Sequence, residues 1–141
     1  MKLPHISILV MACMLLVLFV SGCAKEQMIE REDPNFHYNR GLTYYKESDY
    51  RSAKYHFTQA IMINSDNDEA YFNRGRTNDA LKFYSLSISD YRLAIVINPK
   101  HVLAHRNLAK AYAKKGFFDK ALKTANDALS ICIDLKIKKE L

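Results

Sequence analysis

An internal repeat with a period of 34 residues constrains the fold of this 141-residue chain more than any other feature. The triplet Asn39–Gly41 recurs as Asn73–Gly75, and the same offset leads to Asn107–Ala109. Two further sets recur in step: Tyr50, Tyr84 and Phe118, and Ala60, Ala94 and Ala128. Because they follow one another without insertion, these copies predict stacked units that bury a continuous core. We place the units at residues 34–67, 68–101 and 102–135.

Each unit carries two helical patterns in which small residues lie where two helices would meet. The eighth position of each unit is small: Gly41, Gly75 and Ala109. Two positions in the second half are also small: Ala53, Ser87 and Ala121, then Ala60, Ala94 and Ala128. Small side chains at helical spacing allow close approach of two antiparallel helices, and the larger Phe57 and Tyr91 fill the remaining space. The prediction is an all-α, helix-turn-helix solenoid.

The units resemble the tetratricopeptide repeat family. The second unit carries the resemblance best, in Ala70–Gly75, Ser89–Tyr91 and Ile97–Pro99. The resemblance implies a solenoid of three tetratricopeptide repeats. Arg40 and Arg74 depart from it because they occupy a position that is more often Leu. We expect both to lay their aliphatic stems on the core and to keep the guanidinium outside.

The resemblance also implies a concave groove, lined by the first helix of each repeat, that binds a peptide. We call this surface the first-helix groove, and its candidate residues are Tyr38, Leu42, Tyr45, Phe72, Asn73, Arg76, Arg106, Asn107 and Lys110. This groove would be aromatic at one end and basic at the other, which favours a protein or peptide partner with acidic and apolar residues. The carboxylate clamp of some relatives is absent, since only Asn73 matches it. The alternative is that these residues merely reflect helix composition.

The N-terminal segment has the pattern of an export signal. Residues 6–20 are uncharged and apolar, and only Lys2 is charged in the first 24 residues. They lead into Val20–Cys23, which resembles the lipobox of bacterial lipoproteins. The resemblance implies that residues 1–22 are a signal peptide, that Cys23 carries fatty acyl chains such as palmitate, and that residues 23–33 form a polar tether. An uncleaved signal anchor and an ordinary secretory peptide are the alternatives.

A lipidated Cys23 would place the chain in the bacterial cell envelope, anchored to a membrane. Because Ala24, and not Asp, follows the cysteine, the resemblance favours the outer membrane if the host has two membranes. Cys132 lies in an apolar helical stretch, where we expect it to be buried. Residues 136–141 are too few for a separate capping helix. Self-association of this open end and truncation of a longer array both remain open.

The chemistry of the sequence does not favour an enzyme. We find no phosphate-binding glycine loop, no nucleophile motif and no cofactor motif. His101 and His105 lie four residues apart, but no third ligand completes a metal site, so we predict no metal. The net charge is +6, yet no nucleic-acid motif accompanies it, and we expect no nucleic acid partner. The function predicted is a membrane-anchored adaptor or scaffold for protein–protein interaction; the alternative is a self-assembling structural repeat protein.

Overall fold

The computed structural model describes residues 33–140. The predicted signal peptide, Cys23 and all but the last residue of the predicted tether lie outside these residues. No helix within residues 33–140 is long and apolar enough to cross a membrane.

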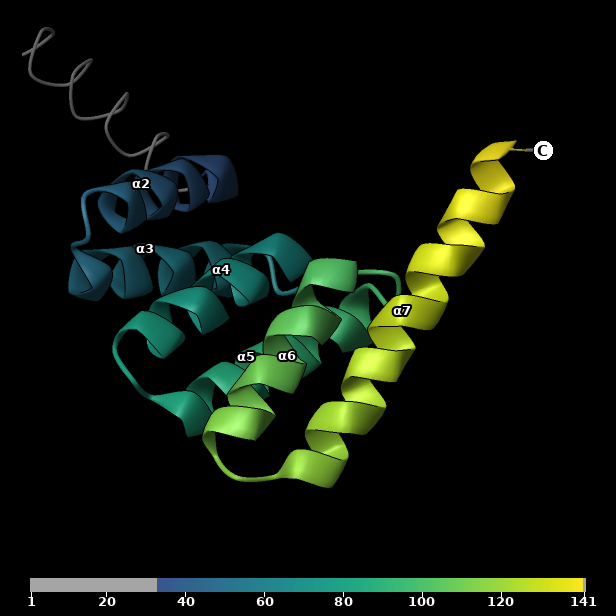
Figure 1. The fold of residues 1–141 in the computed structure, drawn as a ribbon. Helices are drawn as coiled ribbons and strands as arrows, with labels where there is room; N and C mark the ends of the chain where they lie inside the picture. The colour runs from purple at the N-terminus through teal and green to yellow at the C-terminus, as the bar shows by residue number, and fades with distance from the viewer. Residues whose placement is uncertain (1–32, 141) are drawn as a thin grey trace, which may run out of the picture. The chain divides into compact units, whose positions relative to one another are not determined.

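The described part of the chain consists of six helices and contains no strand. The helices are α2 (Pro34–Lys46), α3 (Tyr50–Ile63), α4 (Asp68–Ala80), α5 (Tyr84–Ile97), α6 (Val102–Lys114) and α7 (Phe118–Glu140). Figure 1 shows them stacked in chain order, and each helix packs mainly against the helices before and after it. The predicted all-α helical repeat fold is confirmed.

Local side-chain chemistry sets the helix boundaries. The Asp49 carboxylate accepts a hydrogen bond of 3.1 Å from the Ser52 backbone N–H and caps α3, while the Asn67 side chain accepts one of 2.9 Å from Ala70 and caps α4. The turns inside the three helix pairs share one residue of positive φ, 34 residues apart: Ser48 (63°), Lys82 (63°) and Gly116 (79°). Only the third turn has glycine at this position, the residue type that adopts a positive φ without strain.

The two helices of the first and of the second pair approach closely through the glycine at the eighth position. A Cβ added to Gly41 would lie 2.7 Å from the Phe57 ring, and one added to Gly75 would lie 2.7 Å from the Tyr91 ring. Both rings are fully buried. The absence of a side chain on these glycines is therefore what leaves room for an aromatic ring across the pair.

The second helix pair contains a buried ion pair, which corrects our expectation for Arg74. Its guanidinium donates to both carboxylate oxygens of Asp90, with a shortest distance of 2.7 Å, and the arginine side chain is 20% exposed. The Asn78 amide donates to the same carboxylate at 2.8 Å. The guanidinium turns inward because Asp90 lies across the pair. Arg40 has His56 in the corresponding place, and it stays exposed as expected.

The C-terminal end of the solenoid exposes apolar side chains. Helix α7 has 23 residues against 14 in α3 and in α5, and its C-terminal part extends past the other helices (Figure 1). Leu129 is 59% exposed, whereas its counterpart Ile61 in the first repeat is 8% exposed. The expectation that Cys132 is buried is wrong: its side chain is exposed, and it lies one residue past the place at which α3 and α5 end.

Candidate functional site

The first helices α2, α4 and α6 lie in succession and bring part of the first-helix groove together. The centre of the groove is a cation held against two rings. The Arg76 guanidinium carbon lies 4.5 Å from the ring centroid of Tyr45 on α2 and 5.8 Å from that of Phe72 on its own helix. Stacking of this kind fixes a long side chain in one orientation and leaves its N–H donors available. Its second anchor is the Asn73 amide oxygen, which accepts a hydrogen bond of 3.0 Å from Arg76.

A hydrogen-bonded bridge joins α2 to α4 beside this cation. Asn73 is 4% exposed, and its amide nitrogen donates to the Tyr38 hydroxyl at 3.1 Å and to the Glu69 carbonyl at 2.9 Å. Burial raises the pKa of the Tyr38 hydroxyl, and the Glu69 carboxylate raises it further. Because its polar atoms are occupied within the protein, Asn73 positions its neighbours and presents little surface to a partner.

Phe72 serves the core more than the groove. It is 6% exposed, and its ring centroid lies 4.6 Å from that of His101 and 6.0 Å from that of Tyr91. Its side chain therefore supports the stacked arginine from below. Leu42 and Tyr45, each half-buried, supply the accessible apolar area on α2.

The basic end of the groove lies on α6. Arg106 and Lys110 are exposed, one helical turn apart, and Asn107 between them is half-buried. The two cations also border a hollow between α6 and α7 that sequence reasoning missed. We call this cavity of about 450 Å³ the terminal hollow, and its lining residues are Val102, Arg106, Ala109, Lys110, Ala125, Ala128, Leu129 and Cys132.

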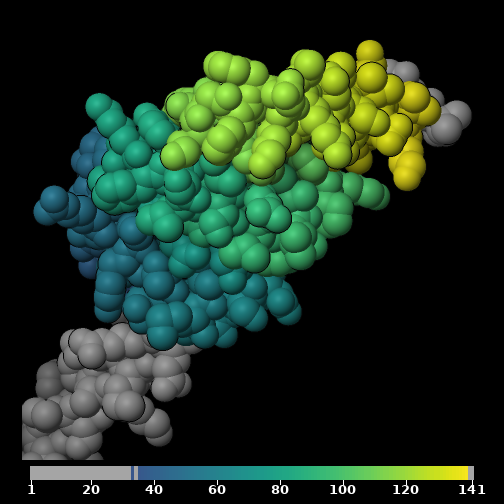
Figure 2. Space-filling view, turned by 90° about the horizontal axis from the view of Figure 1, so that it is seen from below, coloured from purple at the N-terminus to yellow at the C-terminus, as the bar shows by residue number. Residues whose placement is uncertain are grey.

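One signal in the sequence points to the terminal hollow. The position that holds Phe57 in the first repeat and Tyr91 in the second holds Ala125 in the third. The ring that fills each of the first two helix pairs is thus missing from the last one. In Figure 2, α7 forms one side of the described part of the chain, and its C-terminal end projects beyond the neighbouring helices.

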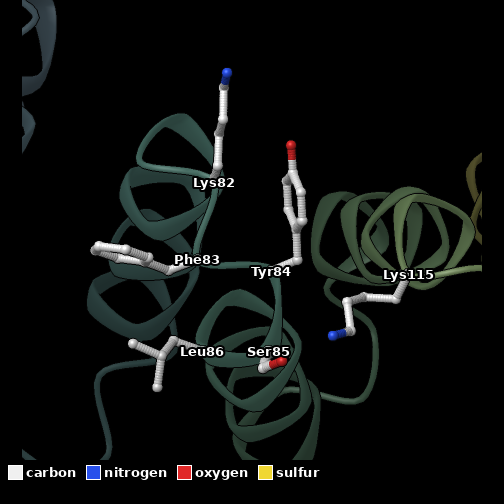
Figure 3. Close-up of a pocket in the computed structure, with 6 residues that line it drawn as sticks. All are labelled: Lys82, Phe83, Tyr84, Ser85, Leu86 and Lys115. Atoms are coloured by element: carbon white, nitrogen blue, oxygen red, sulfur yellow. The ribbon is translucent and has the colours of Figure 1, made fainter.

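A second pocket, of about 270 Å³, lies where the turn before α5 meets the turn after α6. Figure 3 shows that Lys82 and Tyr84 extend in the same direction, whereas Phe83 and Leu86 point to another side. The pocket holds two lysines and no carboxylate. It offers positive charge beside one serine hydroxyl, that of Ser85.

Within residues 33–140, no three His, Cys, Asp or Glu side chains come together in a way that could hold a metal ion. The histidine that precedes α6 and the one inside it both make local contacts. His101 accepts a hydrogen bond of 3.4 Å from the Ala104 backbone N–H and caps the helix, and His105 Nε2 lies 3.0 Å from the Pro99 carbonyl.

Comparison with known proteins adds the family of the first helix pair. The sequence model of the tetratricopeptide repeat matches residues 34–67, which contain α2 and α3. Residues 34–67 form a tetratricopeptide repeat. Mitochondrial import receptor subunit TOM70 of Rattus norvegicus is 30% identical over 100 residues, covering 67% of this chain and 16% of TOM70. The chain spans between 9% and 26% of the length of the curated relatives that it matches.

Solved structures extend this likeness to the arrangement of the helices. A crystal structure of MamA has a TM-score of 0.73 and 25% identity, covering 77% of this chain and 63% of MamA. The TPR2B domain of yeast Sti1, solved in complex with pHsp70, has a TM-score of 0.70 and 23% identity, covering 77% of this chain and 84% of that domain. The helices of this chain are therefore arranged as in these solved structures, one of which is a tetratricopeptide repeat domain.

Proposed function

We propose that this chain is a tetratricopeptide repeat lipoprotein, anchored by lipid on Cys23, that acts as an adaptor or scaffold in the bacterial cell envelope. Proteins with this repeat mediate protein–protein interaction, and the Sti1 relative was solved with such a partner. The anchoring and the location are supported by the sequence of Val20–Cys23. The partner we propose is a protein or peptide segment with acidic and apolar residues.

The stacked Arg76 is the observation that carries the interaction proposal. Its guanidinium carbon lies 4.5 Å from the Tyr45 ring centroid, and the guanidinium donates a hydrogen bond to Asn73. Because the side chain is already held in one orientation, binding a partner costs little further side-chain entropy. An arginine with free donors beside an accessible aromatic ring is typical of residues that dominate binding energy. Arg106 and Lys110 extend the positive charge along the groove and favour an acidic segment.

Substitution of the groove residues tests this proposal. The chain, tagged and expressed in its bacterial host, is cross-linked in the envelope, purified and analysed by mass spectrometry. We expect Tyr45→Ala with Arg76→Ala to lose a partner that the unaltered chain retains. Tyr55→Ala with Arg92→Ala removes the same two residue types from exposed positions on the second helices and should keep that partner. Equal retention by both double variants would contradict recognition in the first-helix groove.

The lipid anchor needs a separate test. Cys23→Ser should abolish labelling with palmitate and release the chain from the membrane fraction, because the acylated thiol is then missing. Density fractionation of the labelled, unaltered chain distinguishes an outer from an inner membrane. A Cys23→Ser chain that still incorporates palmitate and stays in the membrane would refute the lipoprotein proposal.

A further inference from the structure

The internal repeats show what normally covers the surface around the terminal hollow. After the first repeat, Ala60 and Ile61 of α3 pack against Ala70 of α4. After the second repeat, Ala94 of α5 packs in one cluster with Ala104 of α6. In both places the first helix of the following repeat covers the second helix of the preceding one.

The corresponding surface after the third repeat carries the same kind of side chains, and no helix within residues 33–140 covers them. Ala128 corresponds to Ala60 and Ala94, and Leu129 corresponds to Ile61. Leu129 is 59% exposed where Ile61 is 8% exposed, and the adjacent Ala125 is exposed where the buried rings lie in the other repeats. No described helix after α7 packs here. The surface is apolar and concave, and in the first two repeats the equivalent surface binds a helix. These are the features of a site at which a helix docks.

The charges at its border indicate the chemistry of the occupant. Arg106 and Lys110 line the terminal hollow, and both are exposed. The carboxylate-free lining contributes no acid to neutralise them. We infer that the terminal hollow binds an amphipathic α-helix of a partner protein, with its apolar face on Leu129 and Ala128 and with acidic residues beside Arg106 and Lys110. This inference does not depend on the proposed function of the first-helix groove.

The packing of α4 on the first helix pair indicates how a helix in the terminal hollow would be aligned with α6. Asn73 of α4 donates to Tyr38 of α2, and the residue that corresponds to Tyr38 on α6 is Arg106. Arg76 of α4 lies one turn further along and contacts Tyr45 of α2. A docked helix in the same register therefore presents the place of Asn73 to Arg106, and the place of Arg76 to Ala113, three residues past Lys110. These two places are three residues apart on one face, so acidic residues there lie on the side of the helix that faces α6.

A second copy of the chain does not supply these acids through α2. The sequence of α2 (Pro34–Lys46) contains no Asp or Glu. At the place that holds Ala70 in α4, it carries the larger Phe36, and at the place of Arg74 it carries the exposed cation Arg40. In the register of α4, the place of Arg74 lies beside Thr58 of the preceding second helix, and α2 would put the neutral Asn39 at the place of Asn73, so it would offer no acid to Arg106. A partner helix with acids is the complementary occupant.

A pair of helical probes tests this inference on the full chain. Both probes have the α4 sequence (Asp68–Ala80) with Arg74→Leu and a side-chain cross-link on the outward face, because isolated helices of this length are marginal in water. The acidic probe also carries Asn73→Glu and Arg76→Glu, and the basic probe carries Asn73→Lys. By fluorescence anisotropy we expect the acidic probe to bind at least about tenfold more tightly than the basic probe, with affinity falling as salt rises.

Matched variants locate the binding. Leu129→Glu in the terminal hollow should weaken the acidic probe by about tenfold or more, whereas Leu122→Glu, at another exposed leucine of α7, should change it by less than about twofold. Arg106→Glu with Lys110→Glu should reverse the preference between the probes. Equal binding of the two probes, or equal effects of Leu129→Glu and Leu122→Glu, would overturn the inference.

Two further measurements distinguish a partner helix in the terminal hollow from a second copy of the chain and from binding in the first-helix groove. Sedimentation that shows a concentration-dependent dimer, lost in Leu129→Glu, would assign the terminal hollow to a second copy and overturn the assignment to a partner helix. Tyr45→Ala with Arg76→Ala should leave binding of the acidic probe intact, because neither residue lines the terminal hollow. Loss of the probe in that variant would place its binding in the first-helix groove, contrary to the inference.

Discussion

Adding one methyl group at Gly75 should destabilise the fold, although alanine is the better helix former. The new Cβ would lie 2.7 Å from Tyr91 Cε1 and 2.8 Å from Cδ1, closer than carbon atoms approach without displacement. Tyr91 is fully buried and its hydroxyl donates to Asp79 Oδ2 at 3.1 Å, so the ring cannot easily move aside. Overpacking of this kind costs about 1–3 kcal/mol.

Helix propensity offsets part of that cost. Replacing Gly by Ala inside a helix gains up to about 1 kcal/mol, which leaves an expected loss of up to about 2 kcal/mol in the free energy of unfolding. For a folded part of this size, each kcal/mol corresponds to a fall of about 4–8 °C in Tm. Urea denaturation followed by circular dichroism at the helix band measures both the midpoint and the slope.

The third repeat supplies the design of the decisive control. In the third repeat, Ala109 occupies the position of Gly75, and Ala125 occupies the position of Tyr91. Gly75→Ala made in a Tyr91→Ala background reproduces this pair. It should be neutral or stabilise by up to about 1 kcal/mol, because the clash is gone and the propensity gain remains. The same loss from Gly75→Ala in both backgrounds would refute the proposed steric clash.

Two further predictions concern the ion pair of the second repeat and the histidines of the first repeat. Asp90→Ala removes the partner of Arg74, whose side chain is only 20% exposed, and should lower the free energy of unfolding by about 3 kcal/mol in urea denaturation. The control Asp127→Ala, at an exposed position, should lower it by less than about 0.5 kcal/mol. Similar denaturation midpoints for the two variants would mean that the ion pair contributes nothing to stability. Burial, then the neighbouring His37 at 3.0 Å between Nδ1 atoms, lowers the pKa of His56 below its ordinary 6.5. Neutral His56 therefore stabilises the fold above about pH 6.5, and this contribution is lost as the pH falls through its lower folded-state pKa. His56→Gln should reduce the fall of the free energy of unfolding between pH 7.5 and pH 5, and an unchanged pH profile would contradict this assignment.

The contacts that the structure revised are those between residues far apart in the sequence. The inward turn of Arg74 depends on Asp90, sixteen residues later and on the other helix of the pair. Phe72, expected in the groove, is buried because His101 and Tyr91 lie against its ring. Cys132, expected to be buried, is exposed because it borders the open hollow between α6 and α7. A helical pattern indicates which residues share a face, but it does not name the residue opposite.

The sequence by itself determined the helical repeat. Its 34-residue period, its small residues at fixed places and its helix caps act within one helix or between adjacent helices, where spacing along the chain determines spacing in space. Only the tertiary structure decided which groove residues remain available and that the α6–α7 pair contains a hollow. Burial is a property of the neighbours that surround a side chain. At the last repeat the pattern continues, but no described helix covers Leu129.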